Sequence, residues 1–358
     1  SQRAMLAAST RLLLPPMRPS TLTLLVIATM ASPTCSLSLN TPAAHQQAMA
    51  TARTLSRHRS VQLQVTVDIR TFLPVLPCID SQAKGERVLQ IDGGSPSDLL
   101  WFPDRSQLLF ISDGAQYSWS AAEGLAPLAA TAARVRSHAG VGAAQLVSLC
   151  ESGLMRLDLD SGVTTDIAGG SSRARSLVGL GGGRLLTLEA DNSDKWSVTL
   201  VQSGAADAVL LSGLPPLLGA CVSADEDFLF ISTESGVLRA SVDLSTPRAA
   251  APAPFFSPSS GAPGALATDT QGNVYVCTAE GVVVCDDSGD EALCVRTPSA
   301  PSAIGFGGSA LAALFIGCGD AVWRITANVQ GVSSVPSEEL QKRINKQVGA
   351  GDFRHAGW

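Results

Sequence analysis

Few side chains in this sequence stand in arrangements that could do chemistry. The chain has four histidines, His45, His58, His138 and His355, and the first two precede residue 61. It contains neither a GxSxG nor a CxxC motif, and the glycine run at 179–183 (GLGGG) leads into a predicted strand rather than into the helix that a phosphate loop requires. We therefore expect no nucleophilic hydrolase, no His/Cys zinc site and no nucleotide-phosphate loop.

Two charged side chains are candidates because the family resemblance given below places them at or beside its functional positions. Asp98 follows a Pro-Ser pair and could act as a general base, although an acid at such a place more often caps a turn. Arg175, with Arg173 close by, lies in a Ser-rich segment and offers either a fixed positive charge to an anionic ligand or an ordinary solvated arginine. We carry Asp98 as the candidate catalytic residue and Arg175 as the candidate anion-binding residue.

Composition narrows the class of protein. The 358 residues are 45% hydrophobic and 16% charged, with 33 glycines and 20 prolines, which favours a globular chain of short strands joined by turns. The eight cysteines have no regular spacing and are expected to be small buried hydrophobes rather than a disulfide framework.

Charge is distributed unevenly. The only charged side chains before Asp68 are six arginines. The rest of the chain therefore holds all 31 acidic side chains and 25 − 6 = 19 basic ones, which gives it a net charge of about −12. A protein region with this negative net charge is not expected to bind nucleic acid or anionic lipid surfaces.

The first sixty residues have the composition of a targeting leader. An apolar run at 21–31 (TLTLLVIATMA) follows Arg18, and an acid-free Ala/Ser/Thr/Arg segment covers 36–60; these are typical of a secretory signal followed by a transit peptide. We expect residues 1–60 to be removed, with a destination in the secretory pathway or a plastid. Simple secretion and a start upstream of the true one stay open, and no integral membrane association is expected after removal.

A repeat of about forty residues organises the remainder. Six apolar runs begin 38, 39, 43, 46 and 40 residues apart; they are LLFIS (108–112), LVSLC (146–150), LLTLE (185–189), FLFIS (228–232), VYVCT (274–278) and LFIGC (314–318). Each is followed by a turn and a second predicted strand. Four short strands per repeat is the spacing of a β-propeller blade, so the sequence predicts an all-β, six-bladed β-propeller.

The flanks of the repeats receive separate predictions. We place the propeller at residues 61–332, with the alternating segment at 62–70 (QLQVTVDIR) as a candidate ring-closing strand or a detached edge strand. Residues 333–358 form a tail in which 337–347 is predicted to be a short amphipathic helix.

The repeats resemble the gluconolactonase and senescence-marker (regucalcin-like) family, most clearly at 145–169, 268–290 and 320–332. The resemblance implies a metal-dependent lactonase with a calcium, magnesium or manganese ion held in the central channel by a Glu, an Asn and an Asp, with a further Asn nearby. Carried over, the Glu falls on Ser97, the two Asn on Arg175 and Leu218, and the Asp on Gly264.

These substitutions lead to competing hypotheses. The first is a propeller without the family's metal site or any other cofactor, which binds a small molecule or a protein at its upper face and is not an enzyme. The alternative is a diverged metal-dependent lactone or ester hydrolase that uses Asp98 around a re-sited cation. A generic six-bladed repeat protein of the NHL or strictosidine-synthase-like kind is a third.

Overall fold

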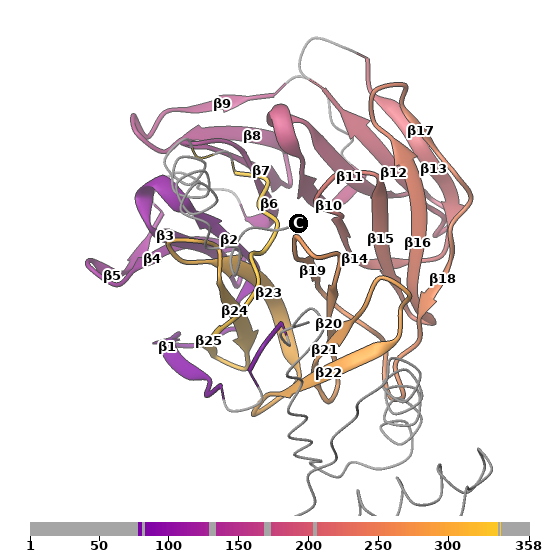
Figure 1. Cartoon of the computed structure of the whole chain (residues 1–358). Coiled ribbons are helices and arrows are strands. Elements are labelled where there is room, and N and C mark those ends of the chain that lie inside the picture. The colour runs from indigo at the N-terminus through magenta and orange to yellow at the C-terminus, as the bar shows by residue number, and fades with distance from the viewer. Residues whose placement is uncertain are drawn as a thin grey trace, which may run out of the picture. The chain divides into compact units, whose positions relative to one another are not determined.

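Six antiparallel sheets, five of four strands and one of five, are arranged around a central axis in the computed structural model (Figure 1). The structure describes residues 78–80, 83–128, 134–167, 173–202, 206–335 and 337. The predicted all-β six-bladed propeller is therefore confirmed. The predicted leader at 1–60, the candidate strand at 62–70 and the predicted helix at 337–347, beyond residue 337, lie outside the described residues.

The blades follow one another along the chain, each from the innermost strand outward. Blade 1 consists of β2 (Ser97–Phe102), β3 (Gln107–Ser112), β4 (Ala115–Ser120) and β5 (Gly124–Pro127), and blade 2 of β6 (Val135–Gly142), β7 (Gln145–Cys150), β8 (Gly153–Asp158) and β9 (Thr164–Asp166). Blade 3 consists of β10 (Ala174–Gly179), β11 (Leu185–Ala190), β12 (Trp196–Val201) and β13 (Ala208–Leu214), and blade 4 of β14 (Leu217–Val222), β15 (Phe228–Thr233), β16 (Gly236–Asp243) and β17 (Arg248–Ala249), with β18 (Ala253–Phe256) also paired to β16. Blade 5 consists of β19 (Leu266–Thr268), β20 (Val274–Thr278), β21 (Gly281–Cys285) and β22 (Glu291–Arg296), and blade 6 of β23 (Pro301–Gly307), β24 (Ala313–Cys318), β25 (Ala321–Thr326) and β1 (Glu86–Gln90).

The six apolar runs are the second strand of each blade. These strands are buried on both faces because the sheets pack face to face around the ring, and this is why the runs lack strict alternation. The hydrophobic core is accordingly divided among the interfaces between blades, with one large cluster joining blades 3 and 4 and another joining blades 5 and 6. Trp101 of blade 1 stacks on Phe315 of blade 6, with ring centroids 5.5 Å apart.

The ring is closed by a strand from the N-terminal side of the propeller. β1 pairs antiparallel with β25, so the last blade combines three strands from its own repeat with one from residues 86–90. The closing strand is therefore Glu86–Gln90, and residues 62–70, for which this role is predicted, lie outside the described residues.

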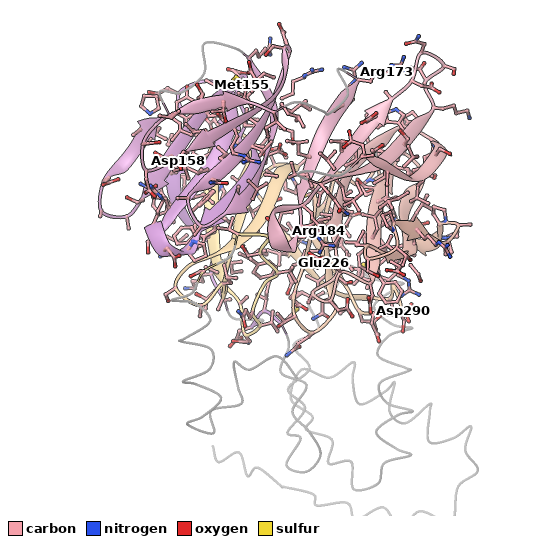
Figure 2. The ribbon with its side chains drawn as sticks, turned by 90° about the horizontal axis from the view of Figure 1, so that it is seen from above. Met155, Asp158, Arg173, Arg184, Glu226 and Asp290 are labelled. Atoms are coloured by element: carbon pink, nitrogen blue, oxygen red, sulfur yellow. The ribbon has the colours of Figure 1, made fainter. Side chains whose placement is uncertain are left out.

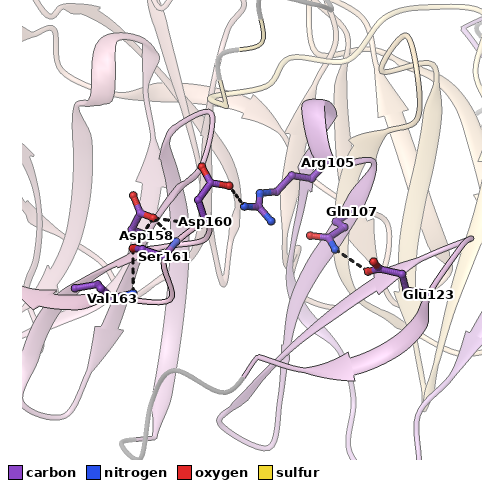
Figure 3. Close-up of polar contacts among 7 residues, drawn as sticks. All are labelled: Arg105, Gln107, Glu123, Asp158, Asp160, Ser161 and Val163. Carbon is purple, nitrogen blue, oxygen red and sulfur yellow. Dashed lines mark hydrogen bonds and ion pairs between the residues drawn. The ribbon is translucent and has the colours of Figure 1, made fainter.

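Polar contacts link neighbouring blades at their exposed rims. Arg105 of the short 3-10 turn η1 (Pro103–Arg105) forms an ion pair with Asp160 of blade 2, close to the turn in which Asp158 accepts hydrogen bonds from Ser161 (Figure 3). Those hydrogen bonds lower the pKa of Asp158. Arg184 and Glu226 make the corresponding link between blades 3 and 4, and Figure 2 labels both.

The cysteines match their prediction. The seven in the described part of the chain are all free thiols, and six of them are buried. Burial raises the pKa of Cys277 to about 12, so this thiol stays protonated and packs as a hydrophobe.

Candidate functional site: the central channel

The innermost strands of the six blades enclose a cavity of about 660 Å³ on the propeller axis. They are β2, β6, β10, β14, β19 and β23, and every one contributes residues to its wall. A cavity of this size is in the range of small-molecule binding sites.

A register irregularity recurs near the first residue of the innermost strand in five blades, and an equivalent bulge lies just before β19 in blade 5. In four blades it leaves one residue unpaired against the second strand; these residues are Arg136, Arg175, Leu218 and Ser302. In blade 5, Gly264 and Ala265 together face Cys277, since Gly264 N donates to Cys277 O and Cys277 N donates to Ala265 O. In blade 1 the irregularity lies between Ser97 and Leu100 and includes Asp98.

Because a β-bulge re-aims the side chain of its extra residue, these positions form a ring at one end of the channel. We call Asp98, Arg136, Arg175, Leu218, Gly264 and Ser302 the bulge ring, and all six line the cavity.

The structure brings the sequence-predicted residues together. Ser97, Arg175, Leu218 and Gly264, the positions that the resemblance assigns to a metal site, all line the cavity, as does Asp98. Arg173 and Glu189 do not line it; the Glu189 carboxylate accepts a hydrogen bond from Thr187 instead.

Two ring members, Arg136 and Ser302, were missed by the sequence reasoning. The repeat register could have found the first, since Arg136 lies ten residues before Leu146 just as Arg175 lies ten residues before Leu185.

Asp98 is held by His138 of the next blade. Its backbone has a positive φ of 49°, which is uncommon for a residue other than glycine. His138 Nε2 donates to the backbone oxygen of Asp98 at 2.6 Å, and Asp98 Oδ2 accepts from the backbone N of His138 at 3.2 Å.

Both nitrogens of the His138 ring have a hydrogen-bonding partner. Its Nδ1 lies 3.1 Å from Nε2 of Gln116, which also donates to Ser148. Burial lowers the pKa of His138, and the neighbouring Asp98 only partly offsets this. A neutral ring that donates from Nε2 and accepts at Nδ1 satisfies both contacts, so His138 is a structural residue with no free nitrogen for a substrate.

The two arginines of the bulge ring are not neutralised. Arg136 Nη2 donates to the backbone oxygen of Cys150 at 3.1 Å, and its buried Nε has no hydrogen-bond partner. Arg175 is exposed to the channel, and within the described ranges no carboxylate forms an ion pair with either guanidinium. The ring therefore carries two positive charges and one negative charge.

The donor set of these positions does not fit a divalent cation. Hard cations take several oxygen ligands, mostly carboxylates and carbonyls, whereas the side chains at 175, 218 and 264 are a guanidinium, an isobutyl group and a hydrogen atom. Among the described residues, no three His, Cys, Asp or Glu side chains come close enough together to hold a metal ion. Asp98 is the single carboxylate in the ring.

The far end of the channel is crossed by the segment after the last strand, residues 331–335, which we call the strap. Gly331 pairs with Asp269 of blade 5 and Val332 N donates to Thr268 O, while Ser333 and Ser334 line the cavity. Val335 is 3% exposed and packs against Phe102 of blade 1 and against blade 2.

Glycines of the inner strands make room for the strap. A Cβ at Gly140 would lie 2.3 Å from Val335 Cγ2, and one at Gly179 would lie 2.4 Å from Ser334 Oγ. Each glycine is four residues beyond the ring arginine of its strand, about 13 Å along it, so the strap crosses the cavity at the end away from the bulge ring.

Within the described ranges, no helix combines the length and the apolarity needed to cross a bilayer.

Comparison with solved structures agrees on the fold. Similar chains include a putative gluconolactonase (17% identity, TM-score 0.63, covering 72% of this chain and 96% of that one) and a gluconolactonase from Xanthomonas campestris (18%, 0.62, 72% and 93%). A calcium-binding protein, regucalcin, from Agrobacterium tumefaciens is also similar (14%, 0.62, 70% and 96%). These identities are low enough that the likeness shows the fold alone.

Sequence comparison identifies the family. No curated protein sequence matches the chain significantly. The family model described as the SMP-30/Gluconolactonase/LRE-like region matches residues 98–319. This match spans more than half of the chain and covers all six inner strands in whole or in part, so the chain belongs to the SMP-30/gluconolactonase/LRE-like family.

Proposed function

We propose that this propeller is a binding protein whose central channel works without a divalent cation and does not hydrolyse lactones. The observation that carries the proposal is the identity of the side chains in the bulge ring: Arg175, Leu218 and Gly264 line the cavity at the positions where the family resemblance implies the oxygen-bearing side chains of two Asn and an Asp. A guanidinium there also repels a cation.

Calorimetric titration of the full chain with calcium, magnesium and manganese tests the first half of the proposal. We expect no saturable heat from any of the three ions. Hydrolysis of glucono-δ-lactone tests the second half, with the Xanthomonas campestris gluconolactonase as the positive control, and we expect no rate above the uncatalysed one. Micromolar cation binding with chelator-sensitive turnover would overturn the proposal.

A restoring variant tests the positional assignment itself. Ser97→Glu, Arg175→Asn, Leu218→Asn and Gly264→Asp together return oxygen donors to the channel. A Cβ at Gly264 meets nothing closer than Cys277 Cβ at 3.7 Å, so the backbone tolerates an aspartate there. We expect this variant to gain cation binding that the parent lacks; failure to gain it, in a folded variant, would mean that these positions do not correspond to a metal site.

A diverged hydrolase is the second candidate, and one observation favours it. The carboxylate of Asp98 lines the cavity, and its one described hydrogen bond, from the backbone N of His138, leaves one oxygen open. A general base needs such a free oxygen within reach of a water molecule. If lactone turnover is found, its loss in Asp98→Asn identifies this carboxylate as the base.

A further inference from the structure

We propose that Arg136 and Arg175 together bind the carboxylate of a small organic acid, and that the apolar part of this acid lies against Leu218. The inference rests on the proposed function, because it requires a channel without a resident cation. It adds the chemical class of the ligand and a second binding residue, Arg136.

Arg136 and Arg175 occupy equivalent positions in the inner strands of adjacent blades, and both line the channel. Arg136 and Arg175 are the bulge residues of β6 and β10. The residues that follow them hold the two strands side by side: Ser137 Oγ lies 3.5 Å from Ser176 Oγ and accepts a hydrogen bond from Leu177 N at 3.0 Å. Two guanidinium groups on neighbouring strands can bind both oxygens of one carboxylate.

Neither of these arginines forms an ion pair with an acid within the described ranges, in contrast to three other arginines. Arg105, Arg184 and Arg324 form ion pairs with acids, and Arg239 lies over the rings of Phe228 and Phe255. Arg175 has none of these contacts, and Arg136 keeps a buried Nε without a hydrogen-bond partner. An anion between them would relieve the repulsion of two like charges and satisfy the free donors.

Leu218 supplies the preference for an organic anion. It is the bulge residue of β14, the inner strand that follows β10 around the ring, and it is 47% exposed inside the channel. On the next blade, Pro263 continues this apolar wall. Covering an exposed leucine by an aliphatic group is favourable, whereas phosphate or sulfate would leave it in water.

The shape of the cavity limits the size of the ligand. The strap crosses the far end, so a ligand enters past the bulge ring and has about 660 Å³ available. That space suits a small molecule and excludes a polypeptide threaded along the axis.

Hexanoate is a suitable probe, with acetate, phosphate and hexan-1-ol as comparisons. Binding to the full chain is measured by ligand-observed NMR at low salt, in buffer depleted of metal by a chelating resin. We expect hexanoate to bind at least threefold more tightly than each comparison compound, because only hexanoate has both the charge and the apolar chain. Arg175→Gln and Arg136→Gln should each weaken hexanoate binding about tenfold.

Two further variants give the controls. Leu218→Ser should remove the advantage of hexanoate over acetate and leave acetate binding unchanged. Arg248→Gln, at an exposed arginine of the outermost strand β17, should change nothing, and thermal unfolding checks that every variant is folded.

The outcomes separate this inference from the proposed function. Less than a threefold loss in Arg175→Gln, or phosphate binding as tight as hexanoate binding, would overturn the carboxylate site while leaving the cation titrations as they stand. Hexanoate binding that appears only after calcium is added would overturn both.

Discussion

Asp98 and His138 hold each other across the interface between blades 1 and 2. The imidazole of His138 donates from Nε2 to the backbone oxygen of Asp98 at 2.6 Å, and the carboxylate of Asp98 accepts from the backbone N of His138 at 3.2 Å. Each residue therefore fixes the backbone of the other. This reciprocal contact stabilises the positive φ of Asp98 and sets the orientation of the only acid in the bulge ring.

Substitution of Asp98 should show how much its side chain contributes to the stability of the fold. Asp98→Asn keeps an acceptor oxygen and a side chain that tolerates positive φ, so we expect its free energy of unfolding to change by less than about 0.5 kcal/mol. Asp98→Ala loses the hydrogen bond and strains the backbone, and should cost about 1–2 kcal/mol. Urea unfolding measures both values.

Asp113→Ala is the matched control for this pair. Asp113 has nearly the same φ, 51°, and no hydrogen bond to His138 is described for it. Its substitution therefore reports the backbone strain alone. Equal costs at the two positions would show that the contact with His138 contributes nothing.

The buried state of His138 predicts a pH dependence of stability. Burial lowers its pKa in the folded protein below the value of 6.5 expected when unfolded. The unfolded chain then binds more protons, so the free energy of unfolding falls as the pH drops below about 6.5, by up to about 1.4 kcal/mol per pH unit. This contribution is fully present above that pH.

Comparison with His138→Gln isolates this contribution from the other titrating groups. The raised pKa of Asp269, caused mainly by its burial, acts in the opposite direction and is present in both proteins. We expect the difference between the two unfolding free energies to change between pH 5 and pH 7.5. A constant difference over that range would refute the assignment of a lowered pKa to His138.

The sequence predicted the fold better than the site, for physical reasons. Runs such as VYVCT at 274–278 are recognisable because burial on both faces demands continuous apolar residues. The closing strand Glu86–Gln90 carries charged residues and buries only Leu89, so its pattern is weaker than the alternation at 62–70. Edge strands need less burial, and their sequences are correspondingly harder to identify.

Site residues were predictable only where a family motif marked them. Arg175, Leu218 and Gly264 could be placed on the channel by resemblance, whereas Arg136 lies in a repeat for which no motif was carried over. The strap was not predicted at all, because its contacts join Val335 to Gly140 across almost two hundred residues. Neither local propensity nor periodicity reports a contact of that kind.

The strap should contribute measurably to stability. Val335→Ala removes two methyl groups from a fully packed place and should cost about 2 kcal/mol. Val163→Ala, at a valine that is 55% exposed, is the control and should change the unfolding free energy by less than about 0.5 kcal/mol. Equal small effects would show that the strap is not packed against blades 1 and 2.

A double-mutant cycle tests the contact between the strap and the channel wall. The added Cβ of Gly140→Ala would lie 2.3 Å from Val335 Cγ2, so the substitution should be costly in the parent and much cheaper in a Val335→Ala background. We expect a coupling free energy of about 1–2 kcal/mol, measured by urea unfolding of the four proteins. Additive effects would place the two residues out of contact.

Ring closure by β1 gives the last prediction. Leu89 is 8% exposed and packs in the cluster between blades 6 and 1 with Trp101 and Val322. Its strand, β1, pairs with β25 of the last blade. Leu89→Ala should cost about 2–4 kcal/mol, because it weakens the one sheet whose strands come from both ends of the propeller. Val209→Ala, at a 61% exposed valine on the outermost strand of blade 3, should have little effect. Opening the ring would expose a sheet edge, so Leu89→Ala should also aggregate faster on heating than Val209→Ala. Light scattering during thermal unfolding measures this difference. Identical behaviour of the two variants would mean that ring closure does not depend on β1.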